Sequence, residues 1–209
     1  ELRAVAATYG TPTYIFDVRE VEARIRLLRS LLPEDTGLCF AVKANPFLIP
    51  YVADLVDRLE VCSPGEYEIC IQEQIAPEKI VVSGVNKTYE SMKRILSYSK
   101  GAGIYTIESE EHAKILRTLA EKNQMPLSVL IRLSSGNQFG VDAETFLWLA
   151  KEIQESPYLT LAGVHYYAGT QKRQSKLEKE LDTLTAFAKT FEEETGTVLN
   201  ELEYGAGMK

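Results

Sequence analysis

The chain has 209 residues and a formal charge of −7, with 45% hydrophobic and 25% charged residues. This balance is typical of a globular domain and excludes a disordered tail or a collagen-like fibre. Acidic and basic residues are interspersed without a Lys/Arg block, which argues against a nucleic-acid or anionic-membrane partner. No apolar run approaches the roughly eighteen residues that a membrane span needs. The three cysteines form no C-x-x-C pair, which favours reduced thiols and a cytoplasmic protein.

The first predicted elements are a strand over Thr13–Phe16 and a helix that begins at Asp17. Asp17 is followed three residues later by Glu20, a capping-box spacing that is typical of a helix start. The helix then carries an apolar stripe at intervals of four, three and four residues, formed by Val21, Ile25, Leu28 and Leu32.

From residue 38 onward, short apolar runs alternate with amphipathic helices. Caps mark two of these helices: Asn45-Pro46 precedes one, and Ser63-Pro64-Gly65-Glu66 precedes the next. The predicted strands are Leu38–Val42, Leu59–Cys62, Ile80–Ser83, Ile104–Ile107, Leu127–Leu133, Leu161–Tyr166 and Val198–Tyr204. Each of them except the last precedes a helix.

This alternation predicts right-handed βαβ units and a parallel sheet. An α/β fold of the TIM-type, the (β/α)8 barrel, suits the pattern better than an open doubly wound sheet, although such a barrel typically needs about 250 residues. We therefore expect residues 1–209 to form one barrel domain that is truncated before strand 8. No interior linker divides it.

In such a barrel the active site lies at the C-terminal ends of the strands. The side chains and glycines at those positions are Lys43, Ser63 with Glu66, Gly84, Glu108, Arg132, His165 with Tyr167 and Thr170, and Gly205 with Gly207. Lys43 closes an apolar run, where desolvation can lower its pKa and make it an amine nucleophile that forms a Schiff base with an aldehyde. Its position alone favours a solvated lysine at a strand end.

The other candidates also have plainer interpretations. The Gly205-Ala206-Gly207 turn can bind a phosphate through backbone N–H groups, or it can be a simple turn. His165 can be a hydrogen-bonded core residue, and Glu66 can be no more than a helix cap. No zinc-type spacing, P-loop or G-x-S-x-G elbow occurs, so we expect no metal site, NTPase or serine hydrolase.

Seven segments, in this order, resemble one known family. They are Tyr9–Asp17 (YGTPTYIFD), Phe40–Pro46 (FAVKANP), Glu60–Glu66 (EVCSPGE), Ile80–Gly84 (IVVSG) followed by Lys87, Ile131–Leu133 (IRL), Gly163–Gln171 (GVHYYAGTQ) and Tyr204–Gly207 (YGAG). The chain resembles the N-terminal barrel portion of the pyridoxal-phosphate decarboxylases of fold type III, which have an alanine-racemase-type barrel. Their members include diaminopimelate, ornithine and arginine decarboxylases.

The resemblance implies pyridoxal 5'-phosphate as the cofactor, held by Lys43 as a Schiff base, and decarboxylation of an amino acid as the reaction. Gly205, Gly207 and Thr170 would bind the phosphate. Arg132, Glu66, His165 and Tyr167 would lie close to the cofactor, and Tyr14 and Phe16 would belong to an entry strand beside the barrel. A homodimer of the full-length protein is also implied.

The sequence departs from the family pattern at three places. Tyr167 stands where the family usually has a second histidine, and a tyrosine there resembles the pattern of specialised relatives with carrier-linked or secondary-metabolite substrates. The loop over Leu133–Gln138 is shorter than in typical diaminopimelate enzymes, which argues against that primary assignment. The Glu-Pro-Gly-Arg segment of strand 8 and the Cys-Asp pair of the C-terminal β-domain are absent, so we expect a fragment of a longer protein, a chain that is completed by a second polypeptide, or an inactive product. A racemase with the same barrel and a non-catalytic cofactor-binding or interaction fragment remain alternatives.

Overall fold

The computed structural model describes residues 1–207, so Met208 and Lys209, the last residues of the expected domain, lie outside the described part. Its strands form one parallel seven-stranded sheet in which spatial order equals chain order. The strands are β1 (Cys39–Ala41), β2 (Arg58–Val61), β3 (Ile80–Val82), β4 (Ile104–Ile107), β5 (Leu127–Arg132), β6 (Leu159–Tyr167) and β7 (Glu201–Gly205). The expected barrel of seven parallel strands is thus confirmed.

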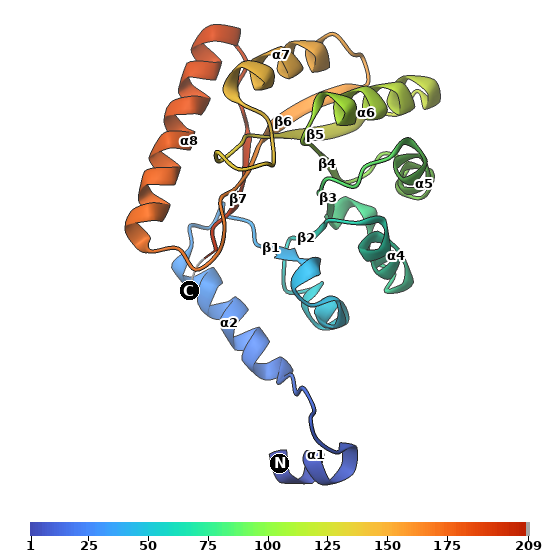
Figure 1. Ribbon diagram of the computed structural model, residues 1–209, viewed down its shortest axis with the longest axis vertical. Coiled ribbons are helices and arrows are strands. Elements are labelled where there is room, and N and C mark those ends of the chain that lie inside the picture. Colours follow the sequence, from blue (N-terminus) through green and yellow to red (C-terminus); the bar gives the residue numbers. More distant parts are fainter. Residues whose placement is uncertain (208–209) are drawn as a thin grey trace.

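Within residues 1–207, eight α-helices accompany this curled sheet (Figure 1). They are α1 (Leu2–Tyr9), α2 (Val18–Leu31), α3 (Ile49–Val52), α4 (Pro64–Gln72), α5 (Tyr89–Ser99), α6 (Glu110–Asn123), α7 (Ala143–Gln154) and α8 (Gln174–Thr195). Helices α2 to α8 lie along the outer side of the sheet, whereas α1 lies away from it. The main apolar core lies between these helices and the strands. A second, small cluster of Val81, Ile104 and Leu130 fills the inside of the barrel.

Two predicted helix caps, at Asn45 and at Ser63, are confirmed. The Asn45 side chain accepts a hydrogen bond from the N–H of Phe47, and the Ser63 side chain accepts one from the N–H of Glu66. At the start of α2 the capping box is wrong in detail. The Asp17 carboxylate accepts from the N–H and guanidinium of Arg19, because the arginine two residues on competes for the oxygens that the box would use.

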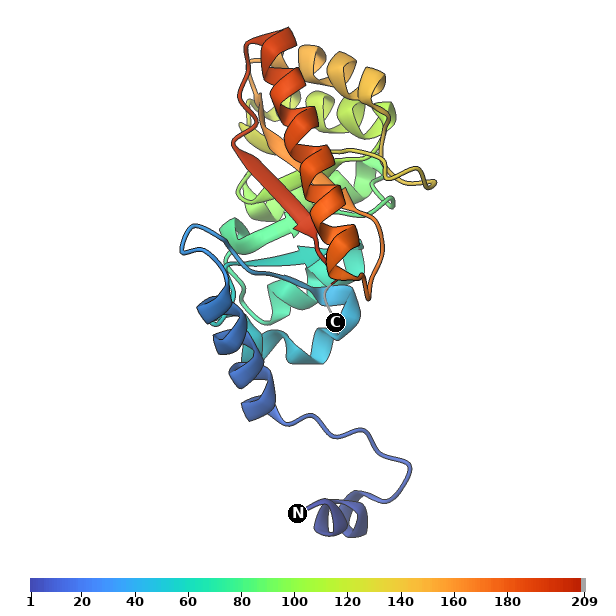
Figure 2. The ribbon, with the colours of Figure 1, turned by 90° about the vertical axis from the view of Figure 1, so that its left-hand side faces the viewer.

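The predicted strand over Thr13–Phe16 is wrong. This segment is irregular, and Tyr14 is 96% exposed. A strand needs a neighbour to accept its backbone hydrogen bonds, and none of the described residues pairs with it. Figure 2 shows the segment as an extended connection between α1 and α2. Helix α1 lies away from the body of the molecule.

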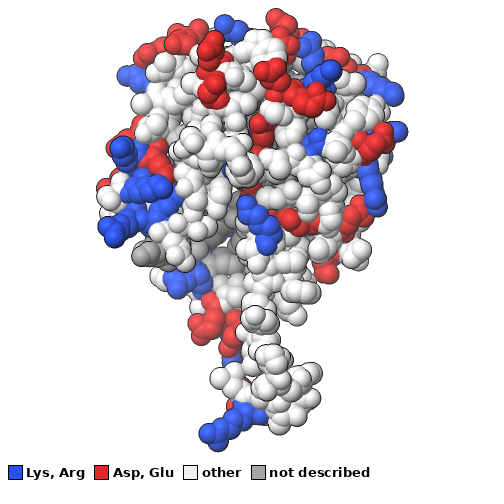
Figure 3. Space-filling model, viewed as in Figure 1, with Lys and Arg blue, Asp and Glu red and all other residues white. Residues whose placement is uncertain are grey.

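Acidic and basic side chains are intermixed over the face of the molecule drawn in Figure 3. Within residues 1–207, no helix combines the length and the apolar character that crossing a membrane would require. Cys39, Cys62 and Cys70 carry free thiols, as the sequence predicts.

Candidate active site

The register of the sheet decides which side chains point into the barrel. Arg132 on β5 pairs with His165 on β6, and His165 pairs with Glu203 on β7, so these three side chains lie on one face. On the other side of the barrel, Ala41 on β1 pairs with Glu60 on β2. Lys43 stands two positions after Ala41. Because strand side chains alternate between the two faces, Lys43 is directed toward the C-terminal mouth of the barrel.

Lys43 lies in a single 3-10 turn, Val42–Ala44, directly after β1. Its ammonium stands over the ring of Tyr167, with Nζ 5.1 Å from the ring centroid. Burial lowers the pKa of Lys43, but the attraction of Cys62, Glu60 and Tyr167 outweighs burial, and the pKa is raised above its usual value. Lys43 is exposed, which confirms the solvated lysine that its position favours, and the lowered pKa that was its alternative is not found.

Glu66 is held by the start of α4. One carboxylate oxygen accepts a hydrogen bond from the N–H of Cys62 at 2.8 Å, and the other accepts from the Ser63 hydroxyl at 3.1 Å. The helix-cap interpretation of this residue is confirmed. The same contacts fix the carboxylate beside the turn that follows β2, close to the mouth of the barrel.

Arg132 is 8% exposed and is fixed by a buried carboxylate. Its Nη1 donates to Glu108 at 2.6 Å, while the ammonium of Lys87 lies 3.5 Å from the other oxygen of Glu108. Lys87 also donates to the Thr106 hydroxyl at 3.1 Å. Burial lowers the pKa of Lys87 to about 8, although Glu108 opposes the shift. Glu108 thus holds two cations, and the guanidinium of Arg132 has little freedom to reorient.

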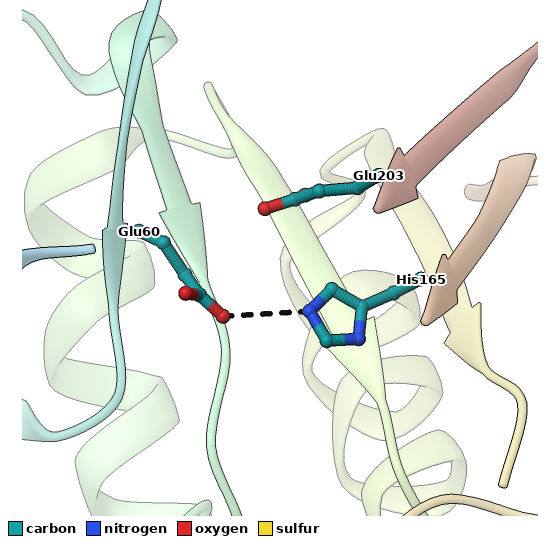
Figure 4. Close-up of side chains that lie close together, drawn as sticks. All are labelled: Glu60, His165 and Glu203. Carbon is teal, nitrogen blue, oxygen red and sulfur yellow. Dashed lines mark ion pairs between the residues drawn. The ribbon is translucent and has the colours of Figure 1, made fainter. Parts of the chain in front are cut away.

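A cluster of Glu60, His165 and Glu203 lies inside the barrel. His165 Nε2 is 3.4 Å from Glu60, and Figure 4 shows Glu203 extending from β7 toward the same space. One ligand-type atom from each residue lies within 4.8 Å of the other two. Burial tends to raise the pKa of Glu60, but the hydrogen bond and charge of His165 lower it to about 2. Burial raises the pKa of Glu203 to about 7, and the charge of Glu60 adds to this shift.

The glycine turn after β7 meets the loop after β6. A Cβ on Gly205 would lie 2.4 Å from the ring of Tyr167, and a Cβ on Gly207 would lie 2.4 Å from the carbonyl oxygen of Gly169 and 2.7 Å from Cα of Thr170. Gly207 also has φ of +58°, a conformation that favours glycine. Bare backbone and the exposed Thr170 thus form a cradle that a side chain would fill.

The structure therefore brings the sequence-predicted residues to one end of the barrel: Lys43, Glu66, Arg132, His165, Tyr167, Thr170, Gly205 and Gly207. Sequence patterns assigned no role to Glu60, although it begins the EVCSPGE segment, or to Glu203, and they gave no reason to pair Glu108 with Lys87. The spacing along the strands was the available signal. Glu60 stands two residues before Cys62, and Glu203 stands two residues before Gly205, so the members of each pair lie on the same face of the sheet. Lys43 and the glycine cradle suit an aldehyde that carries a phosphate, because an amine can bind the first group and backbone N–H groups the second.

Comparison with known proteins agrees with the family resemblance of the sequence. The family model described as "Pyridoxal-dependent decarboxylase, pyridoxal binding domain" matches residues 18–208. A diaminopimelate decarboxylase of Actinosynnema pretiosum is 33% identical over 195 residues, covering 84% of this chain and 43% of the relative. One from Pseudomonas fluorescens is 30% identical and covers 99% of this chain and 54% of the relative. The chain thus spans about half the length of the curated relatives it matches.

Solved structures show the same fold. The lysine/ornithine decarboxylase of Vibrio vulnificus, complexed with cadaverine, has a TM-score of 0.85 at 19% identity; the match covers 99% of this chain and 56% of that one. The diaminopimelate decarboxylase of M. jannaschii, in complex with L-lysine, has a TM-score of 0.83 at 21% identity, with 98% and 52% covered.

Proposed function

This chain belongs to the family of pyridoxal-dependent decarboxylases, and we propose that residues 1–209 are the cofactor-binding barrel domain of an enzyme that decarboxylates an amino acid. The observation that carries the proposal is the shared location of Lys43, Arg132 and the Gly205–Gly207 turn at the C-terminal ends of β1, β5 and β7. An amine, a fixed guanidinium and a glycine cradle are suited to hold pyridoxal phosphate.

Lys43 is the residue we assign to the cofactor's aldehyde, as a Schiff base. Only the neutral amine attacks a carbonyl, and the acidic surroundings raise the pKa of Lys43. Lys43 must therefore give up a proton before it reacts, and the rate of cofactor attachment is expected to rise with pH. Tyr167, whose ring faces the ammonium, offers an aromatic surface at this point of the site.

The phosphate is assigned to Gly205, Gly207 and Thr170. The turn after the seventh strand of a barrel of this type is a frequent phosphate site. Backbone N–H groups and a hydroxyl bind an anion without introducing a charge, and the close approach of Gly207 to Thr170 puts both kinds of donor in one place.

The remaining assigned residues shape the surroundings. Glu108 holds Arg132 in one orientation, the start of α4 holds Glu66, and Glu60 holds His165 inside the barrel. Pyridoxal phosphate, when bound, supplies an electron-accepting ring that takes up the electron pair left by the departing carboxylate. The protein's contribution is to fix that group and the substrate in position.

The names of the relatives support an amino-acid substrate, Tyr167 supports a specialised or carrier-linked one, and the short Leu133–Gln138 loop argues against diaminopimelate itself. We also propose that the full-length protein is a homodimer and works in the cytoplasm, where its free thiols would stay reduced. Light scattering of the purified full-length protein measures the oligomeric state, and a monomer would contradict the dimer.

The test of the activity uses the protein expressed from its complete reading frame. Incubated with pyridoxal phosphate and a panel of L-amino acids, it should release CO₂ from at least one of them and give the corresponding amine. Lys43→Ala should lose both the Schiff-base absorbance and the CO₂ release, while Lys122→Ala, at an exposed position near the end of α6, should keep both. Cofactor binding without CO₂ release from any amino acid would contradict the decarboxylase assignment, and inverted substrate chirality would identify a racemase.

A further inference from the structure

Lys172 is a buried lysine with no part in the proposed reaction. It lies between β6 and α8, and its side chain is 1% exposed. A buried ammonium is unfavourable unless hydrogen bonds and an opposite charge match it. Its Nζ donates to Glu180 Oε2 at 2.8 Å and to the carbonyl oxygen of Gly205 at 3.0 Å. Lys172 therefore links α8 to the glycine turn after β7.

Glu180 completes the arrangement from α8. The hydroxyl of Tyr204, on β7, donates to the same Oε2 at 2.6 Å, and the ammonium of Lys172 lies 4.8 Å from the centroid of the Tyr204 ring. The hydrogen bonds from Lys172 and Tyr204 lower the pKa of Glu180, although burial opposes them. The three side chains come from a loop, a helix and a strand, so their contacts fix these elements against one another.

The backbone of Lys172 makes a second contact with the turn. Its N–H donates to the carbonyl oxygen of Gly207 at 3.0 Å. The carbonyls of both glycines are thus bound by a single residue, one through the ammonium and one through the main chain. Beside Gly169 and Thr170 there is no room for a Cβ on Gly207, so the turn packs closely against the loop after β6 and the two are held together as one unit.

The fixed carbonyls determine where the N–H groups point. In a trans peptide the C=O and the following N–H are directed to opposite sides. Since Lys172 holds the Gly205 carbonyl, the N–H of Ala206 is directed away from Lys172, and among residues 1–207 it donates no hydrogen bond. A donor that is oriented and unused is what an anion site requires.

We propose that Lys172 and Glu180 are positioning residues for the cofactor's phosphate, which fix the Gly205–Gly207 turn with its N–H groups directed at the anion before it binds. This inference rests on the proposed function, which assigns the phosphate to this turn. The benefit is preorganisation, since the turn loses no conformational freedom on binding. The pair adds no net positive charge to attract the phosphate, because Glu180 neutralises Lys172.

The experiment compares Lys172→Met and Glu180→Gln with the control Lys176→Met. The side chain of Lys176 is 58% exposed, and its ammonium lies 3.9 Å from Glu180 but forms no hydrogen bond with the turn after β7 or the loop after β6. Hydrogen exchange of the peptide over residues 204–207 is measured without cofactor. Dissociation constants are measured for pyridoxal phosphate and for pyridoxal, which lacks the phosphate. Urea midpoints verify that each variant folds, and Tyr204→Phe, which removes only the hydroxyl donated to Glu180, replaces any variant that does not.

Positioning predicts that Lys172→Met and Glu180→Gln both exchange faster at this peptide and bind pyridoxal phosphate about tenfold more weakly, with pyridoxal binding unchanged. Lys176→Met should match the parent. A charge effect would instead make Glu180→Gln bind pyridoxal phosphate more tightly, which would overturn the proposal. Unchanged exchange and affinity in both variants would overturn it as well. A parent protein that binds neither ligand would refute the proposed function, and the exchange result would still decide the role of Lys172.

Discussion

Glu203 is a half-buried acid with one buried carboxylate oxygen, and its replacement should stabilise the protein in a pH-dependent way. Its ordinary pKa is 4.5, and burial raises it to about 7 in the folded chain, with the charge of Glu60 adding to the shift. Between these two values the unfolded chain releases a proton that the folded chain keeps, so stability falls as pH rises through this range. The shift corresponds to an upper bound of about 3 kcal/mol, reached above pH 7.

Glu203→Gln keeps the size of the side chain and removes its titration. Urea unfolding of the variant and its parent at about pH 5 and about pH 8 tests the reasoning. The variant should be more stable at the higher pH, by up to about 3 kcal/mol, and nearly equal to its parent at the lower pH. Glu201→Gln is the matched control on the same strand, because Glu201 forms an ion pair with Arg58 and its replacement should destabilise at both pH values.

Two results would refute this reasoning. A variant less stable than its parent at the higher pH would show that the Glu203 carboxylate stabilises the fold. An advantage of equal size at both pH values would show that the effect does not come from a proton.

Two further substitutions test the packing of the site. Glu108→Gln leaves Lys87 and Arg132 without a counter-charge and should lower the free energy of unfolding by about 3 kcal/mol in urea denaturation; an unchanged value would show that the cluster contributes no stability. Gly163→Ala puts a Cβ 1.8 Å from the carbonyl oxygen of Glu201 and should lower the thermal midpoint by several degrees, whereas Gly65→Ala, with only the Ser63 hydroxyl at 4.0 Å, should leave the midpoint nearly unchanged. Equal midpoints for the two alanine variants would contradict the close packing of β6 on β7.

The order of strands and helices was predictable because local signals agree with the fold. Ser63 and Asn45 cap helices as their sequence context predicts, and the apolar runs between the helices become the strands. Thr13–Phe16 fails for a physical reason. Its composition suits a strand, but strand formation depends on a neighbour that the sequence does not name, and the segment is exposed.

The end of the barrel that carries the site was also predictable, since chain order and handedness fix which strand ends converge. Lys43, Arg132 and Gly205 lie there as expected. The electrostatics were not predictable. The pKa of Lys43 depends on Glu60, which is not a sequence neighbour, and register is known only once the strands pair. Lys172 is the extreme case, because its partners on α8 and β7 carry no motif that links them to it.

The central claim is that Lys43 holds pyridoxal phosphate. Its most direct test is borohydride reduction of the protein incubated with pyridoxal phosphate, which makes the lysine–cofactor bond permanent, followed by peptide mass mapping. One pyridoxyl-phosphate adduct is expected, on Lys43, and it should disappear in Lys43→Ala. An adduct located instead on Lys87 or Lys172, or full cofactor binding with no adduct on Lys43, would contradict it.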